Sequence, residues 1–149
     1  MKADSEGAEL YEANFEELVR ELEQLDQSFS DLSNSVENKT FFVSHAAFGH
    51  IAGTYGFEQI AIAGLNSQDE PSQKELTEIV NLAKEKNIHF IAFEQNVSSK
   101  LTEIVQKEIR AEAVEMHNLS VLTQEDIDNG ESYFTLMKKN LEVLETILK

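Results

Sequence analysis

The chain of 149 residues contains no cysteine, which excludes disulfides, thiolate metal sites and thiol catalysis. Any metal ion would therefore be bound by imidazole nitrogen and by oxygen. The sequence has a single proline and a hydrophobic fraction of 41%, as expected of an ordered globular protein. No apolar run approaches the roughly 20 residues that a membrane helix needs.

Basic residues are also scarce. Twelve Lys and Arg stand against 28 Asp and Glu, which gives a formal net charge of -16. Nucleic acids and anionic lipid surfaces are bound by clustered Lys and Arg, so the balance argues against both kinds of partner. We interpret the acidic surplus mainly as a source of solubility.

The signatures of common enzyme classes are missing too. The sequence has no Gly-x-Ser-x-Gly elbow, no Walker loop and no Gly-x-Gly-x-x-Gly segment after a predicted strand. A phosphorylation receiver would need acidic residues after its first strand, where this chain has Ser44 and His45. We therefore predict that the protein is not an enzyme.

The first segment, residues 1–35, is predicted to be one long amphipathic helix. Its apolar residues recur at spacings of three and four, which places them on one helical face. They are Phe15, Leu18, Leu22, Leu25, Phe29 and Leu32. The simplest interpretation is a helix that lies on its own domain. A coiled coil is less favoured, because the apolar seam lasts under three heptads.

The remaining residues, 36–149, alternate short apolar strands with helices. The strands are expected at 40–44, 59–63, 88–93 and 113–116. The helices are expected at 45–55, from the Ser-x-x-Glu capping box at Ser72, from Ser98 or Ser99 with Leu101, Ile104 and Val105 buried, and at 131–149. A short capped turn is expected at Thr123–Asp126. This alternation predicts an α/β fold: a four-stranded parallel sheet in doubly wound order, with helices on both faces.

Polar side chains follow several of the predicted strands, where ligands collect in open α/β sheets. His45 follows the first strand, Glu94 the third, and His117, Asn118 and Ser120 the fourth. Imidazole together with oxygen suits zinc better than calcium or magnesium.

Each of these residues also has a purely structural interpretation. His45 could be a helix N-terminal histidine packed by Phe48, and Glu94 could cap the following loop. His50 is five residues from His45, so the two do not share a helix face, and we interpret it as a surface or packing residue. His89 is expected inside the third strand as a core histidine with its hydrogen bonds satisfied.

Several blocks of the sequence resemble one known family. They include Phe41-Phe42-Val43-Ser44-His45-Ala46-Ala47-Phe48-Gly49-His50, Ile91-Ala92-Phe93-Glu94, Ser98-Ser99-Lys100-Leu101 and Tyr11-x-x-Asn14. In order and spacing these blocks are similar to the zinc-binding solute-binding proteins of bacterial metal ABC importers, a family of metal-binding lipoproteins and adhesins.

The resemblance implies that the chain is the C-terminal lobe of a two-lobed protein. The long helix would join the lobes, and an N-terminal lobe of the parent chain would supply two further histidine ligands. The parent would be extracytoplasmic, often a lipoprotein, and would deliver zinc to the membrane permease of the importer. The chain as given lacks the signal, so Met1 is expected to begin a shortened chain.

The resemblance also implies a metal site. His45 matches the family's histidine from this lobe, where manganese-type relatives tend to have a carboxylate, and this favours zinc. Ser120 aligns where many relatives carry a glutamate ligand. A serine hydroxyl is a poor zinc ligand, so water or His117 could fill that position; Glu94 is a further neighbour of the metal. With one imidazole, the lobe should fold alone but bind Zn²⁺ weakly or not at all.

A different class of function competes with this one. The chain could be a standalone cytoplasmic α/β interaction or regulatory domain with no metal function. Composition favours neither alternative, Ser120 counts against the importer protein, and the ordered family blocks count for it.

Overall fold

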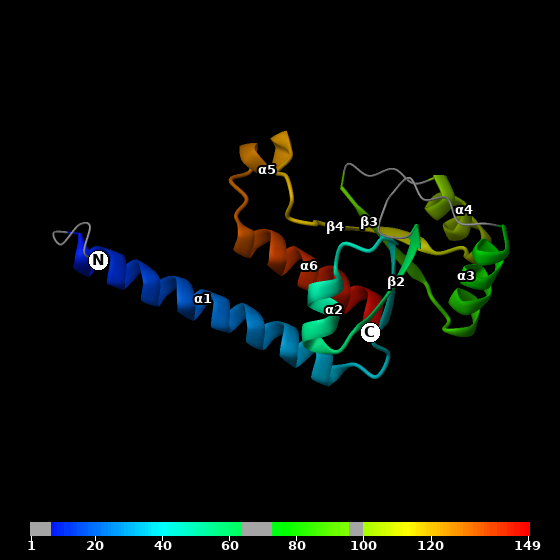
Figure 1. Ribbon diagram of the computed structural model, residues 1–149, viewed down its shortest axis with the longest axis horizontal. Coiled ribbons are helices and arrows are strands. Elements are labelled where there is room, and N and C mark those ends of the chain that lie inside the picture. The colour runs from blue at the N-terminus through cyan, green and yellow to red at the C-terminus, as the bar shows by residue number, and fades with distance from the viewer. Residues whose placement is uncertain (1–6, 64–72, 96–99) are drawn as a thin grey trace.

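The computed structural model describes residues 7–63, 73–95 and 100–149, which form six helices and four strands. Figure 1 shows their arrangement. In chain order they are α1 (Ala8–Ser35), β1 (Thr40–His45), α2 (Gly49–Tyr55), β2 (Glu58–Ala63), α3 (Gln73–Glu85), β3 (Phe90–Glu94), α4 (Lys100–Ile109), β4 (Glu112–Met116), α5 (Gln124–Asp128) and α6 (Tyr133–Leu148). The segment 64–71 and the predicted caps at Ser72, Ser98 and Ser99 lie outside the described residues.

The sheet confirms the predicted α/β class. Its strand order is β2-β1-β3-β4, and every neighbouring pair is parallel. The chain moves outward from β1 to β2 on one side and then returns to β3 and β4 on the other. The strand order therefore reverses between β1 and β3, and this is the point at which doubly wound sheets bind ligands.

Alternate side chains of the central strand enter two different cores, because successive residues of a strand point to opposite faces. Phe41 and Val43 pack with residues of α1, α2 and α6 on one face. Phe42 and Ile91 pack with residues of α3 and α4 on the other face. Both faces of the sheet are thus covered by helices, as predicted.

The boundary after the first strand differs from the prediction. His45 is the last residue of β1, paired with Ala63, and α2 begins four residues later at Gly49. The Ala47 N–H bonds the His45 carbonyl at 2.9 Å, and the Phe48 N–H bonds the side chain of Gln59 at 2.7 Å. His45 is thus a strand-end residue, and residues 46–48 connect it to α2.

Two burial predictions were wrong. His89 is not a core histidine: it is exposed and precedes β3, because Asn87 adopts a positive φ of 52° and turns the chain there. Ile104 is 46% exposed, whereas its neighbour Val105 is fully buried. The predicted turn at Thr123 is confirmed as a capping box with Asp126, and α6 begins after the Ser132 cap.

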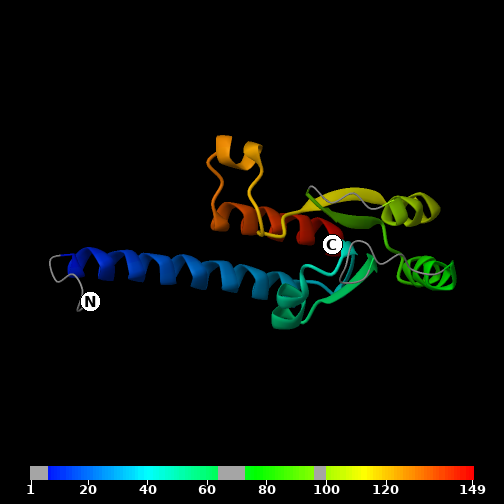
Figure 2. The same cartoon turned by 45° about the horizontal axis from the view of Figure 1, so that its top comes forward.

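The long helix α1 packs along part of its length. Leu25, Phe29 and Leu32 are buried, and the Phe29 ring stacks on Tyr55 with 5.1 Å between centroids. Phe15 and Leu18, on the same seam, are 64% and 47% exposed. Figures 1 and 2 both show the N-terminal half of α1 projecting away from the sheet. The prediction that the whole helix lies on its own domain was therefore wrong for this half.

Within the described ranges, no helix has the length and apolar character needed to cross a bilayer.

Candidate metal centre

Two of the predicted site residues meet at the point where the strand order reverses. His45 ends β1 and Glu94 ends β3, and these strands are direct neighbours in the sheet. Both residues lie at the carboxyl ends of their strands. The topology alone therefore brings an imidazole and a carboxylate together at the edge where α/β proteins bind ligands.

The two side chains are in direct contact, with His45 Nδ1 hydrogen-bonded to Glu94 Oε1. The Glu94 side chain is fully buried, and that of His45 remains 22% exposed. Because the contact engages Nδ1, the second ring nitrogen, Nε2, is the atom with which His45 can bind a metal. Metal-bound histidines commonly donate their other N–H to a carboxylate in this way.

Asn118 and Ser120 extend this contact. Asn118 Nδ2 donates a hydrogen bond to Glu94 Oε2 at 2.7 Å. Asn118 Oδ1 accepts hydrogen bonds from the Ser120 N–H at 3.0 Å and from the Ser120 hydroxyl at 2.7 Å. Ser120 is therefore linked to His45 through two intervening side chains.

His117 is buried, and its hydrogen-bond partners are not those of His45 and Glu94. It is 7% exposed, its Nδ1 accepts a hydrogen bond from the Leu119 N–H at 2.8 Å, and its Nε2 lies 3.4 Å from Asp126 Oδ2. Hydrogen bonds from Thr123 lower the pKa of Asp126, and the nearby His117 lowers it further. These contacts join His117 to α5 rather than to His45 and Glu94.

Asn140 of α6 holds the loop that follows β4. Its Oδ1 accepts from the His117 N–H, and its Nδ2 donates to the His117 carbonyl, both at 2.8 Å. Two residues later Leu119 has a φ of 63°, a conformation that costs a non-glycine residue free energy. The loop from His117 to Ser120 is thus pinned at its start and held in an unfavourable backbone conformation.

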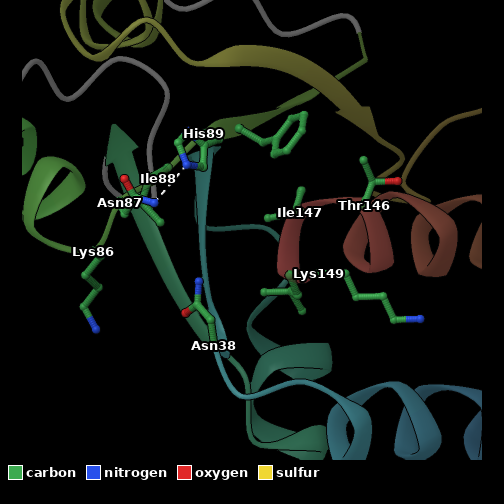
Figure 3. A pocket seen from close by; sticks show the side chains of 10 residues that line it. Asn38, Lys86, Asn87, Ile88, His89, Thr146, Ile147 and Lys149 are labelled. Atoms are coloured by element: carbon green, nitrogen blue, oxygen red, sulfur yellow. Dashed lines mark hydrogen bonds between the residues drawn. The ribbon is translucent and has the colours of Figure 1, made fainter.

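The other two histidines lie elsewhere. His50 is exposed on α2, in keeping with its prediction as a surface residue. His89 lies before β3, at the amino-end edge of the sheet, within 2.9 Å of the Asn87 side chain. Figure 3 shows this pair in a hollow that Asn38 and the end of α6 also line.

A complete metal site is not found in the described part of the chain. There, no three His, Asp or Glu side chains are grouped so that they could hold a metal ion. His45 can contribute one nitrogen, and both Glu94 oxygens already accept hydrogen bonds. The residues present fit zinc through a single imidazole, and they leave the rest of the coordination shell to other groups.

Sequence reasoning missed the role of Asn140. It lies on the buried face of α6 among Leu136, Met137, Leu144 and Leu148. A polar residue in the middle of an apolar helical stripe must find hydrogen-bond partners, because burial without them is costly. The polar residue within this apolar stripe was the sequence signal that could have identified Asn140 as a structural hydrogen-bonding residue.

The structure thus combines a doubly wound parallel sheet, one imidazole at its switch point and a long helix that is only partly covered. The family described as ZnuA, the periplasmic component A of a zinc-uptake complex, matches residues 1–147. The chain belongs to this family.

Among curated proteins, the chain is similar to the high-affinity zinc uptake system protein ZnuA of Bacillus subtilis. The two are 36% identical over 148 residues, covering 99% of this chain and 46% of that protein. It is 35% identical to the zinc-binding lipoprotein AdcA of Streptococcus pneumoniae strain R6, over 92% of this chain and 27% of the relative. The chain thus spans half or less of the length of these relatives.

The chain is also similar to proteins of known structure. The metal-dependent lipoprotein YcdH of Bacillus subtilis superposes with a TM-score of 0.83 at 37% identity, covering 99% of this chain and 55% of that one. The Zn(II)-bound ZnuA-like domain of Streptococcus pneumoniae AdcA gives a TM-score of 0.76 at 34% identity, over 95% of this chain and 53% of the other. The α/β fold is therefore shared with about half of each of these two chains.

Proposed function

We propose that this chain is the C-terminal lobe of an extracytoplasmic protein that captures zinc and delivers it to an ABC permease, and that it catalyses no reaction. Family membership and the names of its relatives, which are zinc uptake and zinc-binding proteins, support this proposal. The relatives named as lipoproteins support an extracytoplasmic, membrane-anchored parent.

The observation that carries the proposal is the position of His45. It stands at the carboxyl end of β1, beside the switch point, and its Nδ1 contacts a buried carboxylate. This leaves Nε2 as the metal-binding atom, and neutral imidazole is a good ligand for zinc. A hard oxygen donor at this position would suit manganese or magnesium better.

Zinc would be bound by closure of two lobes, with this lobe contributing the His45 nitrogen. A preceding lobe would contribute further imidazoles, since structural zinc sites in proteins are almost always four-coordinate. The exposed apolar residues on the N-terminal half of α1, Phe15 and Leu18 among them, support such a lobe, because it would cover them.

Neither Ser120 nor His117 is placed to serve as a fourth zinc ligand. Ser120 is exposed and hydrogen-bonded to Asn118, and a hydroxyl binds zinc poorly. His117 is held by Leu119 and Asn140. We infer that water or a group of the preceding lobe completes the shell, and that Glu94 acts beside the ligand rather than as one.

The alternative of a standalone cytoplasmic regulatory domain is not favoured. The family match covers nearly the whole chain, and the relatives that share it are zinc-binding transport components.

The test is a calorimetric titration of the chain with Zn²⁺, compared with the variants His45→Ala and His50→Ala. His50 is exposed on α2 and serves as the matched histidine control. We expect weak binding by the chain and by His50→Ala, and loss of that binding in His45→Ala. Equal binding by all three proteins would show that zinc is held elsewhere and would refute the assignment of His45.

A further inference from the structure

We propose that Ser120, Asn118 and Glu94 form a hydrogen-bond relay that fixes His45 as the tautomer with its proton on Nδ1, so that Nε2 is presented to the metal. The inference rests on the proposed function for the identity of the ligand. The relay itself follows from contacts of the described residues alone and requires no bound metal.

The relay begins with the orientation of the Asn118 amide. Ser120 offers two donors to one Asn118 atom, its N–H at 3.0 Å and its hydroxyl at 2.7 Å. The amide oxygen accepts both, whereas the amide nitrogen could accept neither. Ser120 therefore turns the oxygen of Asn118 toward itself and the NH₂ group toward Glu94.

Glu94 connects the Asn118 amide to the His45 imidazole. One carboxylate oxygen accepts the Asn118 N–H at 2.7 Å, and the other contacts His45 Nδ1. An ionised carboxylate has acceptors and no donor, so Nδ1 must carry the proton that joins them. In a neutral imidazole, Nε2 is then the nitrogen with a lone pair for zinc. The side chain of Glu94 is fully buried, and water does not compete for the bond.

The substitution Glu94→Gln should reverse the tautomer. Asn118 still presents its NH₂ group, so the new amide oxygen faces Asn118 and the new NH₂ group faces His45 Nδ1. The imidazole must then accept at Nδ1 and carry its proton on Nε2. The metal-binding nitrogen would be blocked although the substitution hardly changes the side-chain volume.

A second substitution should restore the Nδ1–H tautomer of His45. In the Glu94→Gln, Asn118→Asp double variant, the aspartate still accepts from Ser120 but now also accepts from the glutamine NH₂ group. The glutamine oxygen then faces His45, and the proton returns to Nδ1. The double variant has the net charge of the original chain, so the rescue does not depend on total charge.

The experiment is a two-bond ¹H–¹⁵N correlation spectrum of the histidine side chains in the full 149-residue chain without metal, at about pH 8.5, where an ordinary imidazole is neutral. The His45 signals are those that vanish in His45→Ala. Glu115→Gln is the matched control, since Glu115 is an exposed glutamate on the neighbouring strand β4. Zinc affinity is measured on the same proteins by calorimetry.

The proposal predicts the Nδ1–H tautomer in the original chain, in Glu115→Gln and in the double variant, and the Nε2–H tautomer in Glu94→Gln. It also predicts a 10- to 100-fold loss of zinc affinity in Glu94→Gln alone, the usual effect of removing a metal ligand's carboxylate partner. An Nε2–H tautomer in the original chain, or no change in Glu94→Gln, would overturn the relay. The predicted tautomers together with unaltered zinc binding in His45→Ala would support the relay and overturn the assignment of His45 as the zinc ligand.

Discussion

Replacing Asn140 by alanine should destabilise the fold strongly. Asn140 is 1% exposed, and its side chain satisfies both the N–H and the carbonyl of His117, each at 2.8 Å. Alanine would leave these two backbone groups buried without a partner. Each buried polar group without its hydrogen bond costs about 1–3 kcal/mol, so for the two groups we expect a loss of about 2–6 kcal/mol in the free energy of unfolding.

Such a loss would be a large part of the stability of a domain of this size, which is about 5–15 kcal/mol. The assay is urea denaturation followed by circular dichroism, in which the midpoint should fall while the slope stays unchanged. Asn81→Ala is the matched control, because Asn81 is exposed on α3, and its effect should stay within about 0.5 kcal/mol. A loss below about 1 kcal/mol in Asn140→Ala would show that this side chain does not anchor the loop after β4.

Three further predictions concern the core, alkaline pH and the open ligand position. Phe29→Ala should lower the free energy of unfolding by about 3–5 kcal/mol, because Phe29 is fully buried. Phe15 lies on the exposed half of the same seam, so Phe15→Ala should change the free energy of unfolding by less than about 0.5 kcal/mol. Equal losses in the two variants would contradict the packing of α1. Burial, together with a hydrogen bond to Asp26, raises the pKa of Tyr55 from 10.0 to about 12, so the fold favours the protonated phenol and stability should fall as the pH rises from about 10 to about 12. An ultraviolet titration should show one late-ionising tyrosine that Tyr55→Phe removes; uniform titration of all the tyrosines near 10 would count against it. Ser120→Glu should raise zinc affinity at least about tenfold, or about 1.4 kcal/mol, because it adds a carboxylate ligand. Ser120→Gln, which adds no carboxylate, should leave the affinity unchanged. Equal zinc affinities of the two variants in calorimetry would place residue 120 away from the metal.

The sheet and its helices were predictable because their signals are local. Short apolar strands alternate with capped amphipathic helices, and this pattern alone specifies parallel strands covered on both faces. The boundary at His45 was not predictable in the same way. It depends on the pairing of His45 with Ala63 of the next strand, and no local pattern reveals that contact.

The site was predictable in position but not in connectivity. Strand ends indicated His45, Glu94, His117 and Ser120 as neighbours, because carboxyl ends of parallel strands share an edge. The sequence did not show that Glu94 contacts His45 or that His117 is held by Asn140 instead. Those partners are 49 and 23 residues apart, and side-chain hydrogen bonds over such separations depend on tertiary packing.

The burial of α1 was also only partly predictable from the sequence. Periodicity placed Phe15 and Phe29 on one apolar seam, and both do lie on that face. It could not tell that the fold of this chain covers Phe29 and leaves Phe15 exposed, since a hydrophobic pattern records which face is buried and not which neighbour buries it.

The assignment of His45 as the metal ligand can be tested by following the imidazole nitrogens of all four histidines while Zn²⁺ is added to the chain. We predict that the Nε2 signal of His45 shifts on zinc binding, while the signals of His50, His89 and His117 keep their positions at the same zinc concentration. A shift of His117 or of the exposed histidines that leaves His45 unchanged would contradict the claim that this lobe contributes His45 to the metal.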